Sequence, residues 1–176
     1  MLNLNTKERM LLQDEKGHEE LCVQKYQDYS NKACDPELKN LFSQLAQKEQ
    51  EHLNSINQML SGTVPNVNAS QGGQQQQGMQ SQQQQQQQQG MQSQQQQNMQ
   101  QSTNINAQGI QNNMNHDKML CQDSLSTEKY VSSTYNTAIF EFRDANARQV
   151  LNHIQKEEQE HGEKIYNYMN QHGMYN

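Results

Sequence analysis

The residues of this sequence that could do chemistry lie in a short string that occurs twice. A glutamate is followed three residues later by a histidine at Glu49 and His52, and again at Glu158 and His161. On a helix, residues three apart lie on the same face, so each pair points in one direction. Carboxylates and neutral imidazole together suit cations such as iron and manganese. The repeated string therefore indicates a metal site, provided that the two copies meet in space.

A single Glu-x-x-His string on a helix is common and usually belongs to a solvated face. Here each copy is embedded in a series of apolar residues with alternating three- and four-residue steps. The first series is Leu38, Phe42, Leu45, Glu49, His52, Ile56 and Met59, and the second is Ala147, Leu151, Ile154, Glu158, His161, Ile165 and Tyr168. This spacing predicts two amphipathic helices with both strings on their buried faces.

The two strings belong to a longer internal repeat. Shifting residues 7–60 by 109 places lays them over residues 116–169 without a gap. The matching residues include Met10 with Met119, Glu19 with Glu128, Tyr26 with Tyr135, Asp35 with Asp144, and Ile56 with Ile165. A match of this length indicates an internal duplication.

Each copy of the repeat predicts a helix, a tight turn and a second helix. Asp35 before Pro36 is a strong helix start, and Asp144 occupies the same place in the second copy. Asn5 followed by Glu8 is typical of a capping box. Neither hairpin can bury its apolar stripe alone, so we expect the two to pack into a four-helix bundle.

The helix rise places the acidic residues of the predicted bundle at one level. Glu19 and Glu49 are about equally far from the first turn, at ~1.5 Å per residue, and Glu128 and Glu158 are level about the second. Four glutamates and two histidines then converge in the core, as in ferritin-like di-iron and di-manganese bundles. The candidate ligands are Glu19, Glu49, His52, Glu128, Glu158 and His161. The candidate cofactor is a pair of Fe or Mn ions.

Two interpretations of this layer remain open. In the first, two cations neutralise carboxylates that would otherwise repel one another away from water. In the second, an ancestral metal layer persists as a polar network in which protonated Glu, His, Tyr26 and Tyr135 satisfy one another. Those two tyrosines lie about two helical turns after Glu19 and Glu128 and are either outer partners of the site or ordinary core residues.

Composition divides the chain into three parts, which are residues 1–60, 61–115 and 116–176. The hydrophobic fraction of the whole chain is 31%, which is low for a globular protein. Residues 61–115 contain no charged or aromatic residue and are dominated by glutamine, so they predict a disordered low-complexity linker. Its length permits the full-length crossover that a ferritin-like bundle needs between its second and third helices.

Charge and hydropathy argue against two classes of partner. The net charge is −6, and no cluster of Lys and Arg stands out, so we expect no nucleic acid partner. No apolar run approaches the ~20 residues of a membrane helix, and the first residues lack the apolar stretch of a signal peptide. We therefore expect no membrane partner and a protein that is made inside the cell.

Parts of the second hairpin resemble the spore coat protein F family of endospore-forming bacteria. The resemblance is carried by "EKYVSSTYNTAIFEFRD" from Glu128 and by the tyrosine-rich "IYNYMNQHGMY" from Ile165. The first hairpin is similar to a companion hairpin of clostridial members. The resemblance implies an all-α, ferritin-like four-helix bundle of two duplicated hairpins, and the long glutamine-rich crossover departs from the compact family pattern.

The same resemblance implies a structural component of the spore coat without an established catalytic activity. It implies synthesis in the mother-cell cytoplasm, deposition on the forespore, and other coat proteins or further copies of the chain as partners. The alternative function is a ferritin-like di-iron or di-manganese oxidoreductase that acts on oxygen or peroxide. The sequence leaves both functions open, because it reveals candidate ligands but not whether an oxidant reaches them.

Overall fold

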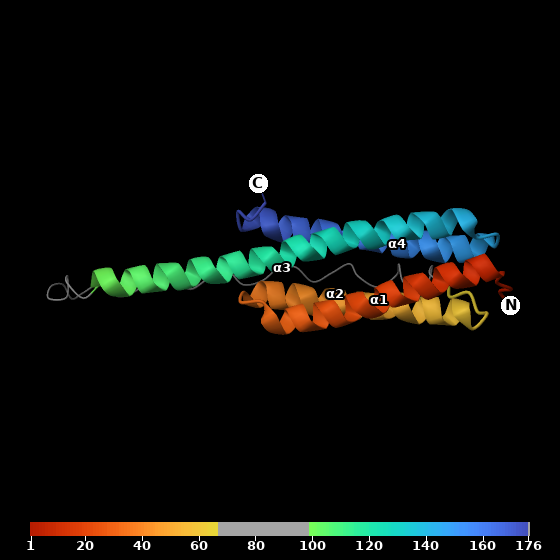
Figure 1. Cartoon of the computed structure of the whole chain (residues 1–176), viewed down its shortest axis with the longest axis horizontal. Coiled ribbons are helices and arrows are strands. Elements are labelled where there is room, and N and C mark those ends of the chain that lie inside the picture. Colours follow the sequence, from red (N-terminus) through yellow and green to blue (C-terminus); the bar gives the residue numbers. More distant parts are fainter. Residues whose placement is uncertain (67–98, 176) are drawn as a thin grey trace, which may run out of the picture.

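The described part of the protein is entirely helical. The computed structural model describes residues 1–66 and 99–175, without the side chains of residues 99–107. Its helices are α1 (Thr6–Lys32), α2 (Pro36–Leu60), α3 (Met99–Glu141) and α4 (Ala145–Gln171), and these residues contain no strand (Figure 1). The predicted all-α fold is confirmed. Within the same residues, no helix combines the length and apolar character needed to cross a membrane.

The helices begin where the sequence predicted. Asn5 and Glu8 form a reciprocal capping box, in which each side chain accepts a hydrogen bond from the other residue's backbone N–H. The side chain of Asp35 caps α2, with Pro36 as the first helical residue, and Asp144 caps α4 through the N–H groups of Asn146 and Ala147. These caps fix where each hairpin turns back, and hence the register of its two helices.

Two antiparallel hairpins, α1–α2 and α3–α4, pack against each other so that α1 contacts α3 and α2 contacts α4. Both predicted apolar series are buried along their whole length, and together with Leu12 and Cys22 of α1 and Val131 and Ala138 of α3 they form one core. Burying a side chain such as Leu45 or Ile165 contributes about 1.5–3 kcal/mol. This shared core holds the two hairpins at a fixed level relative to each other.

The second and third helices run in the same direction. The backbone N–H of Leu2, before α1, donates to the carbonyl of Gly62, just after α2, so α2 ends beside the start of α1. In contrast, α3 enters the bundle at the opposite end, where Asp117 contacts the turn between α1 and α2. Figure 1 shows the same arrangement, with the yellow end of α2 and the green start of α3 at opposite ends.

Each hairpin closes the turn of the other with a buried carboxylate. Asp117 of α3 accepts hydrogen bonds from the backbone N–H groups of Cys34 and Asp35, both at 2.8 Å. At the other end, Glu8 of α1 accepts from the backbone N–H of Arg143 at 2.9 Å. Burial alone would raise the pKa of Glu8, but the hydrogen bonds and charge of Arg143 outweigh it and lower that pKa. Glu8 and Asp117 are equivalent positions of the repeat. Each hairpin therefore uses the same position to accept hydrogen bonds from the turn of the other hairpin.

The described residues include both ends of the predicted linker, residues 61–66 and 99–115. Residues 99–115, which the composition assigned to the linker, are the first part of α3. In Figure 1 this part of α3 projects beyond the other three helices. These residues include no proline and only one glycine, and extending an existing helix avoids the cost of a new nucleus. The glutamine-rich tract at residues 71–98, for which disorder was predicted, lies outside the described residues.

Candidate metal centre

All six predicted ligands lie in one buried layer across the middle of the bundle. None of their side chains exposes more than 2% of its surface. Glu19 comes from α1, Glu128 from α3, and the two Glu-x-x-His pairs from α2 and α4. The structure therefore brings the predicted residues together from all four helices.

The layer divides into two groups that share two carboxylates. One group is Glu19, Glu49, His52 and Glu158, and the other is Glu49, Glu128, Glu158 and His161. Within each group, one candidate ligand atom of each residue lies within 4.8 Å of the others. Glu49 and Glu158 belong to both groups. A carboxylate that bridges two cations would have to be shared in this way.

The histidines are wedged between these carboxylates. His52 Nδ1 lies 2.9 Å from Glu158 Oε1 and 3.3 Å from Glu49 Oε2. His161 Nδ1 lies 3.0 Å from the other oxygen of Glu49. The two imidazole rings stack at a centroid distance of 5.5 Å. In this structure the histidines therefore supply the positive or hydrogen-bonding partners of the shared glutamates.

Two buried tyrosines cross between the hairpins to the outer glutamates. Tyr26 of α1 donates its hydroxyl hydrogen bond to Glu128 of α3, and Tyr135 of α3 donates to Glu19 of α1. The four residues are two repeat-related pairs, so both contacts follow one pattern. Burial, together with the nearby carboxylates, raises the pKa of both tyrosines, which keeps them protonated as donors. Of the two interpretations of these tyrosines, the contacts favour that of outer partners.

A further outer partner, Glu157, was missed by the sequence reasoning. Its Oε2 lies 2.9 Å from His52 Nε2 and 3.3 Å from His153 Nε2. Half-burial alone would raise the pKa of Glu157, but the hydrogen bond and charge of His52 outweigh it and lower the pKa to about 2. Glu157 comes from α4 and His52 from α2, so only the register between hairpins reveals the contact. The repeat gives no signal either, because the equivalent of Glu157 is Lys48.

The pKa values of the four glutamates in the layer shift in opposite directions. Burial and the neighbouring carboxylates raise the pKa of Glu19 and of Glu158 to about 7. The same causes raise the pKa of Glu128 well above its ordinary value. Burial also acts on Glu49, but its hydrogen bonds with His161 and His52 outweigh it and lower its pKa to about 2. Without cations, protons on the glutamates must therefore offset part of the buried negative charge.

The unpaired atoms of the described residues concentrate in this layer. Five buried side-chain oxygens lack a hydrogen-bond partner, and four of them are Glu19 Oε2, Glu128 Oε2, Glu158 Oε1 and Glu158 Oε2. Glu158 Oε1 is close to His52 Nδ1, but not in hydrogen-bond geometry. Buried oxygens without partners are costly, and a divalent cation between them would remove that cost. The donor set therefore fits two oxygen- and nitrogen-ligated cations.

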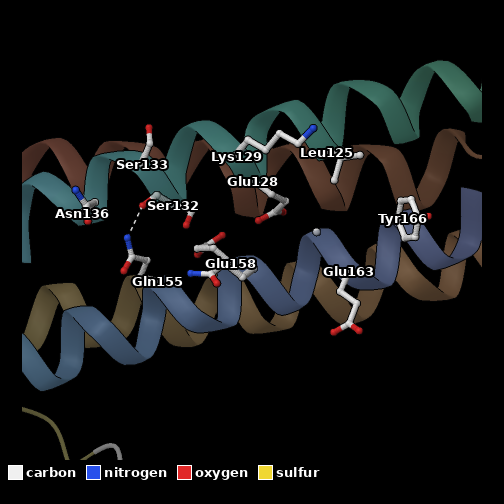
Figure 2. Close-up of a pocket in the computed structure, with 12 residues that line it drawn as sticks. Leu125, Glu128, Lys129, Ser132, Ser133, Asn136, Gln155, Glu158, Glu163 and Tyr166 are labelled. Atoms are coloured by element: carbon white, nitrogen blue, oxygen red, sulfur yellow. Dashed lines mark hydrogen bonds between the residues drawn. The ribbon is translucent and has the colours of Figure 1, made fainter. Parts of the chain in front are cut away.

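One surface pocket reaches this layer. It lies between α3 and α4, has a volume of about 740 Å³, and includes Glu128 and Glu158 among its lining residues. Figure 2 shows these two carboxylates facing each other between the helices. On one side of them, the side-chain amide of Gln155 donates a hydrogen bond to the backbone carbonyl oxygen of Ser132. The pocket thus approaches the layer from the second hairpin, while both oxygens of Glu158 and Oε2 of Glu128 remain buried behind its wall.

A second cluster with ligand-type atoms lies at the turn between α1 and α2. Cys34, His116 and Asp117 offer atoms within 4.8 Å of one another. However, both oxygens of Asp117 accept backbone N–H groups, and His116 Nε2 lies 3.2 Å from the carbonyl oxygen of Lys32. These polar groups already have partners within the protein, so the cluster is explained by the closure of the turn.

Comparison with known proteins identifies the second hairpin. Residues 116–176 match the family model described as the Coat F domain. No curated protein and no solved structure matches the chain. The predicted relationship with the spore coat protein F family is confirmed for these residues, which include α4, most of α3, and Glu128, Glu158 and His161 of the layer.

Proposed function

We propose that this chain, whose residues 116–176 match the Coat F domain, is a structural protein of the spore coat with a ferritin-like bundle that holds two metal ions. The observation that carries the metal site is the pair of ligand groups that share Glu49 and Glu158. The family match supports the place of action, and the layer supports what the protein does there.

The helix arrangement supports a ferritin-like bundle. In that fold, a long connection crosses the bundle between the second and third helices, and the metal ligands are one Glu from each of two helices and a Glu-x-x-His from each of the others. Here α2 and α3 run in the same direction. Glu19 and Glu128 are the single glutamates of α1 and α3, and α2 and α4 carry the pairs.

Glu19 and His52 would hold one ion, Glu128 and His161 the other, and Glu49 and Glu158 would bridge the two. When bound, iron or manganese supplies two adjacent positive charges and positions for an external ligand. Tyr26, Tyr135 and Glu157 hydrogen-bond three of these ligands and fix their orientation. A site held from four helices also joins the two hairpins across the core.

Metal analysis of the purified protein tests the site. The protein is expressed without a metal-binding tag in medium that contains iron and manganese, and metal per chain is determined by elemental analysis. We expect about two equivalents of Fe or Mn, and loss of metal in both Glu49→Ala and Glu158→Ala.

Matched controls come from the same strings. Glu51 and Glu160 lie two residues after the bridging glutamates, and their partners are the lysines Lys48 and Lys156 outside the layer. Glu51→Ala and Glu160→Ala should therefore retain the metal. Metal that is far below two equivalents and survives Glu49→Ala and Glu158→Ala would contradict a di-metal layer.

The proposed location is the spore coat, after synthesis in the mother-cell cytoplasm. The proposed partners are other coat proteins and further copies of this chain, with neither nucleic acid nor a membrane among them. Fractionation of sporulating cells tests this, with detection of the chain by peptide mass spectrometry. We expect it in the mother-cell extract first and in the coat extract of mature spores later. Its absence from the coat extract would contradict the location.

An oxidoreductase is the second candidate function, and the pocket at Glu128 and Glu158 is the observation that favours it. A site that small molecules can reach is a requirement for reaction with oxygen or hydrogen peroxide. Peroxide and oxygen consumption by the metal-loaded protein distinguishes the two functions. Turnover that disappears in Glu49→Ala would establish the enzyme, whereas two bound ions without turnover would leave a structural metal site.

A further inference from the structure

The two hairpins differ at the helix faces that flank the metal layer. In the first hairpin, Val23, Ala46 and Leu53 occupy positions next to the ligands, and Val23 and Ala46 are buried. The equivalent residues of the second hairpin, 109 places further on, are Ser132, Gln155 and Gly162. All three line the pocket between α3 and α4. The repeat is therefore broken where the second hairpin opens towards solvent.

The largest difference is at Gly162, which has no side chain where the first hairpin has Leu53. A Cβ built on Gly162 would lie 3.6 Å from Leu125 Cδ1 and 3.8 Å from Glu128 Cβ, which are ordinary contact distances. An alanine therefore fits without displacement of a neighbour, whereas a leucine side chain would continue into the pocket. The glycine has an ordinary helical backbone, because positive φ values among the described glycines occur at Gly62 and Gly173 only. The role of Gly162 is thus to leave space and not to permit a turn.

The α2–α4 side of the layer is covered by charged side chains. The Nε2 atom of His52 is occupied by Glu157, which lies 4.0 Å from Lys48 Nζ and also contacts His153. Neither His52 nor Glu19 lines the α3–α4 pocket, whereas Glu128 and Glu158 do. All six side chains are at most 2% exposed, so the two halves of the layer differ in their distance from this pocket and not in their exposure.

We propose that the pocket between α3 and α4, held open by Gly162, is the route by which divalent cations reach the layer and by which a small external ligand reaches the bound ions. The inference rests on the proposed two-metal site and adds its direction of access. A cation would arrive first at Glu128 and Glu158, and an ion held by Glu19 and His52 would lie farther from the pocket. Small anions and peroxide are the class of ligand that this route admits, because bound cations would offset the charge of the two glutamates that line it.

The rate of metal uptake tests this route without reference to catalysis. Metal-free protein is mixed with Co(II), and binding is followed by the visible absorption of the bound ion. Gly162→Leu restores the residue type of Leu53 and should slow uptake at least tenfold, with the final metal content unchanged. Gly162→Ala gives the same gain in helix propensity without filling the pocket, so its uptake rate should stay within about twofold of the parent protein.

A second variant guards against a folding defect in Gly162→Leu. Ser132→Val introduces the residue type of Val23 on the facing helix and should also slow uptake, and thermal unfolding followed by circular dichroism verifies that each variant is folded. With the Co(II)-loaded proteins, azide serves as the probe of external access. The spectral change that azide causes in the parent protein should appear more slowly in both closed variants.

The possible results separate this inference from the proposed function. Uptake of Co(II) by folded Gly162→Leu and Ser132→Val at the parental rate would overturn the route and leave the two-metal site intact. A parent protein that binds no Co(II), iron or manganese would overturn the site itself, and the route with it. Slow uptake in both closed variants and a parental rate in Gly162→Ala support the route.

Discussion

At the scale of single residues, three outer hydrogen bonds hold candidate ligands of the layer in place. Tyr26 and Tyr135 each approach a glutamate of the other hairpin, and Glu157 approaches His52. These partners orient the candidate ligand side chains, because they fix which oxygen or nitrogen faces the centre of the layer. The unpaired oxygens of Glu19, Glu128 and Glu158 are left on the inner side.

Removing one tyrosine hydroxyl should therefore cost stability even without metal. In Tyr26→Phe and Tyr135→Phe, a buried carboxylate loses its donor, and we expect the free energy of unfolding to fall by about 1–3 kcal/mol. Urea denaturation of the metal-free protein measures the loss. Tyr130→Phe, at an exposed tyrosine, is the control and should change stability by less than about 0.5 kcal/mol. Equal effects of all three substitutions would reduce the two tyrosines to ordinary core residues.

The protonated glutamates predict how the metal-free protein responds to pH. The folded-state pKa values of Glu19 and Glu158, about 7, are above those of the unfolded chain, so the folded state retains protons that the unfolded state loses. Their contribution to the free energy of unfolding is complete below the pKa of the unfolded chain and is lost as the pH rises through 7. Glu49 and Glu157, with pKa values of about 2, act in the opposite window and lose their contribution as the pH falls below about 4.5.

We therefore expect the metal-free protein to be most stable near pH 5 and to lose more than about 1 kcal/mol by pH 8, an amount that one unit of pKa shift represents. Urea denaturation in the presence of a chelator, at a series of pH values, measures this. Glu19→Gln should weaken the pH dependence, whereas Glu20→Gln, at an exposed neighbour, should preserve it. Bound metal should reverse the trend, because binding to deprotonated carboxylates strengthens as pH rises. A metal-free protein that gains stability from pH 5 to pH 8 would contradict the charges assigned to the layer.

The convergence of the six candidate ligands in one layer was predictable from sequence, because their spacing within each hairpin is set by helix geometry alone. Two Glu-x-x-His pairs on apolar faces, with Glu19 and Glu128 level with them, sufficed. Glu157 was not predictable, because its contact with His52 depends on the register between hairpins, which the sequence of one chain does not encode locally. The same reason left open whether the tyrosines pack or donate.

At the scale of the elements, the reciprocal turn contacts are what set the register of the hairpins. Asp117 and Glu8 lie near opposite ends of the bundle, and each accepts hydrogen bonds from the turn of the other hairpin. A shift of one helical turn between hairpins would break both contacts and would also move the glutamates apart by ~5.4 Å. The turns therefore help to hold the layer together from a distance.

Asp117→Ala should destabilise the protein by about 2–3 kcal/mol, because two backbone N–H groups lose a charged acceptor. Asp14→Ala, at an exposed acid of α1, is the control and should remain within about 0.5 kcal/mol of the parent protein. The effects of Asp117→Ala and Glu8→Ala should add in the double variant, since the sites are far apart and share no partner. Urea denaturation measures all four variants, and an Asp117→Ala protein as stable as its control would exclude the turn contact as a stabilising element.

The boundaries of the helices were predictable wherever a cap marked them. Asn5, Asp35 and Asp144 begin their helices as expected. The start of α3 carries no such mark, and residues 99–115 combine a linker-like composition with a continued helix. Composition predicts what a segment can bury, and a helix that merely extends another requires no burial. For this reason composition alone does not mark the residue at which α3 begins.

At the scale of the whole molecule, the direction of the helices sets a length requirement on the connection between hairpins. α2 has 25 residues and spans about 37 Å at ~1.5 Å per residue, and its end and the point where α3 enters lie at opposite ends. At ~3.3–3.6 Å per extended residue, at least about eleven residues are needed to return along the bundle. An up-down bundle with the same helices would need only a short turn.

Replacing residues 67–115 by a Gly-Ser dipeptide should therefore prevent the hairpins of one chain from pairing. We expect such a chain to unfold or to exchange hairpins with a second chain. A Gly-Ser linker of roughly two dozen residues should restore a folded monomer. Size-exclusion chromatography with light scattering, together with circular dichroism, distinguishes these states. A folded monomer with the dipeptide would contradict the parallel course of α2 and α3.

The most direct test of the two-metal layer is anomalous diffraction from crystals of the protein grown with Mn(II), recorded on both sides of the manganese absorption edge. The account predicts two peaks about 3.5–4 Å apart, both in contact with Glu49 and Glu158. One should lie against Glu19 and His52 and the other against Glu128 and His161. A layer without anomalous density, in which the glutamates form hydrogen bonds with histidines, tyrosines and water, would contradict the two-metal layer. The layer would then be a polar network inherited from a metal-binding ancestor.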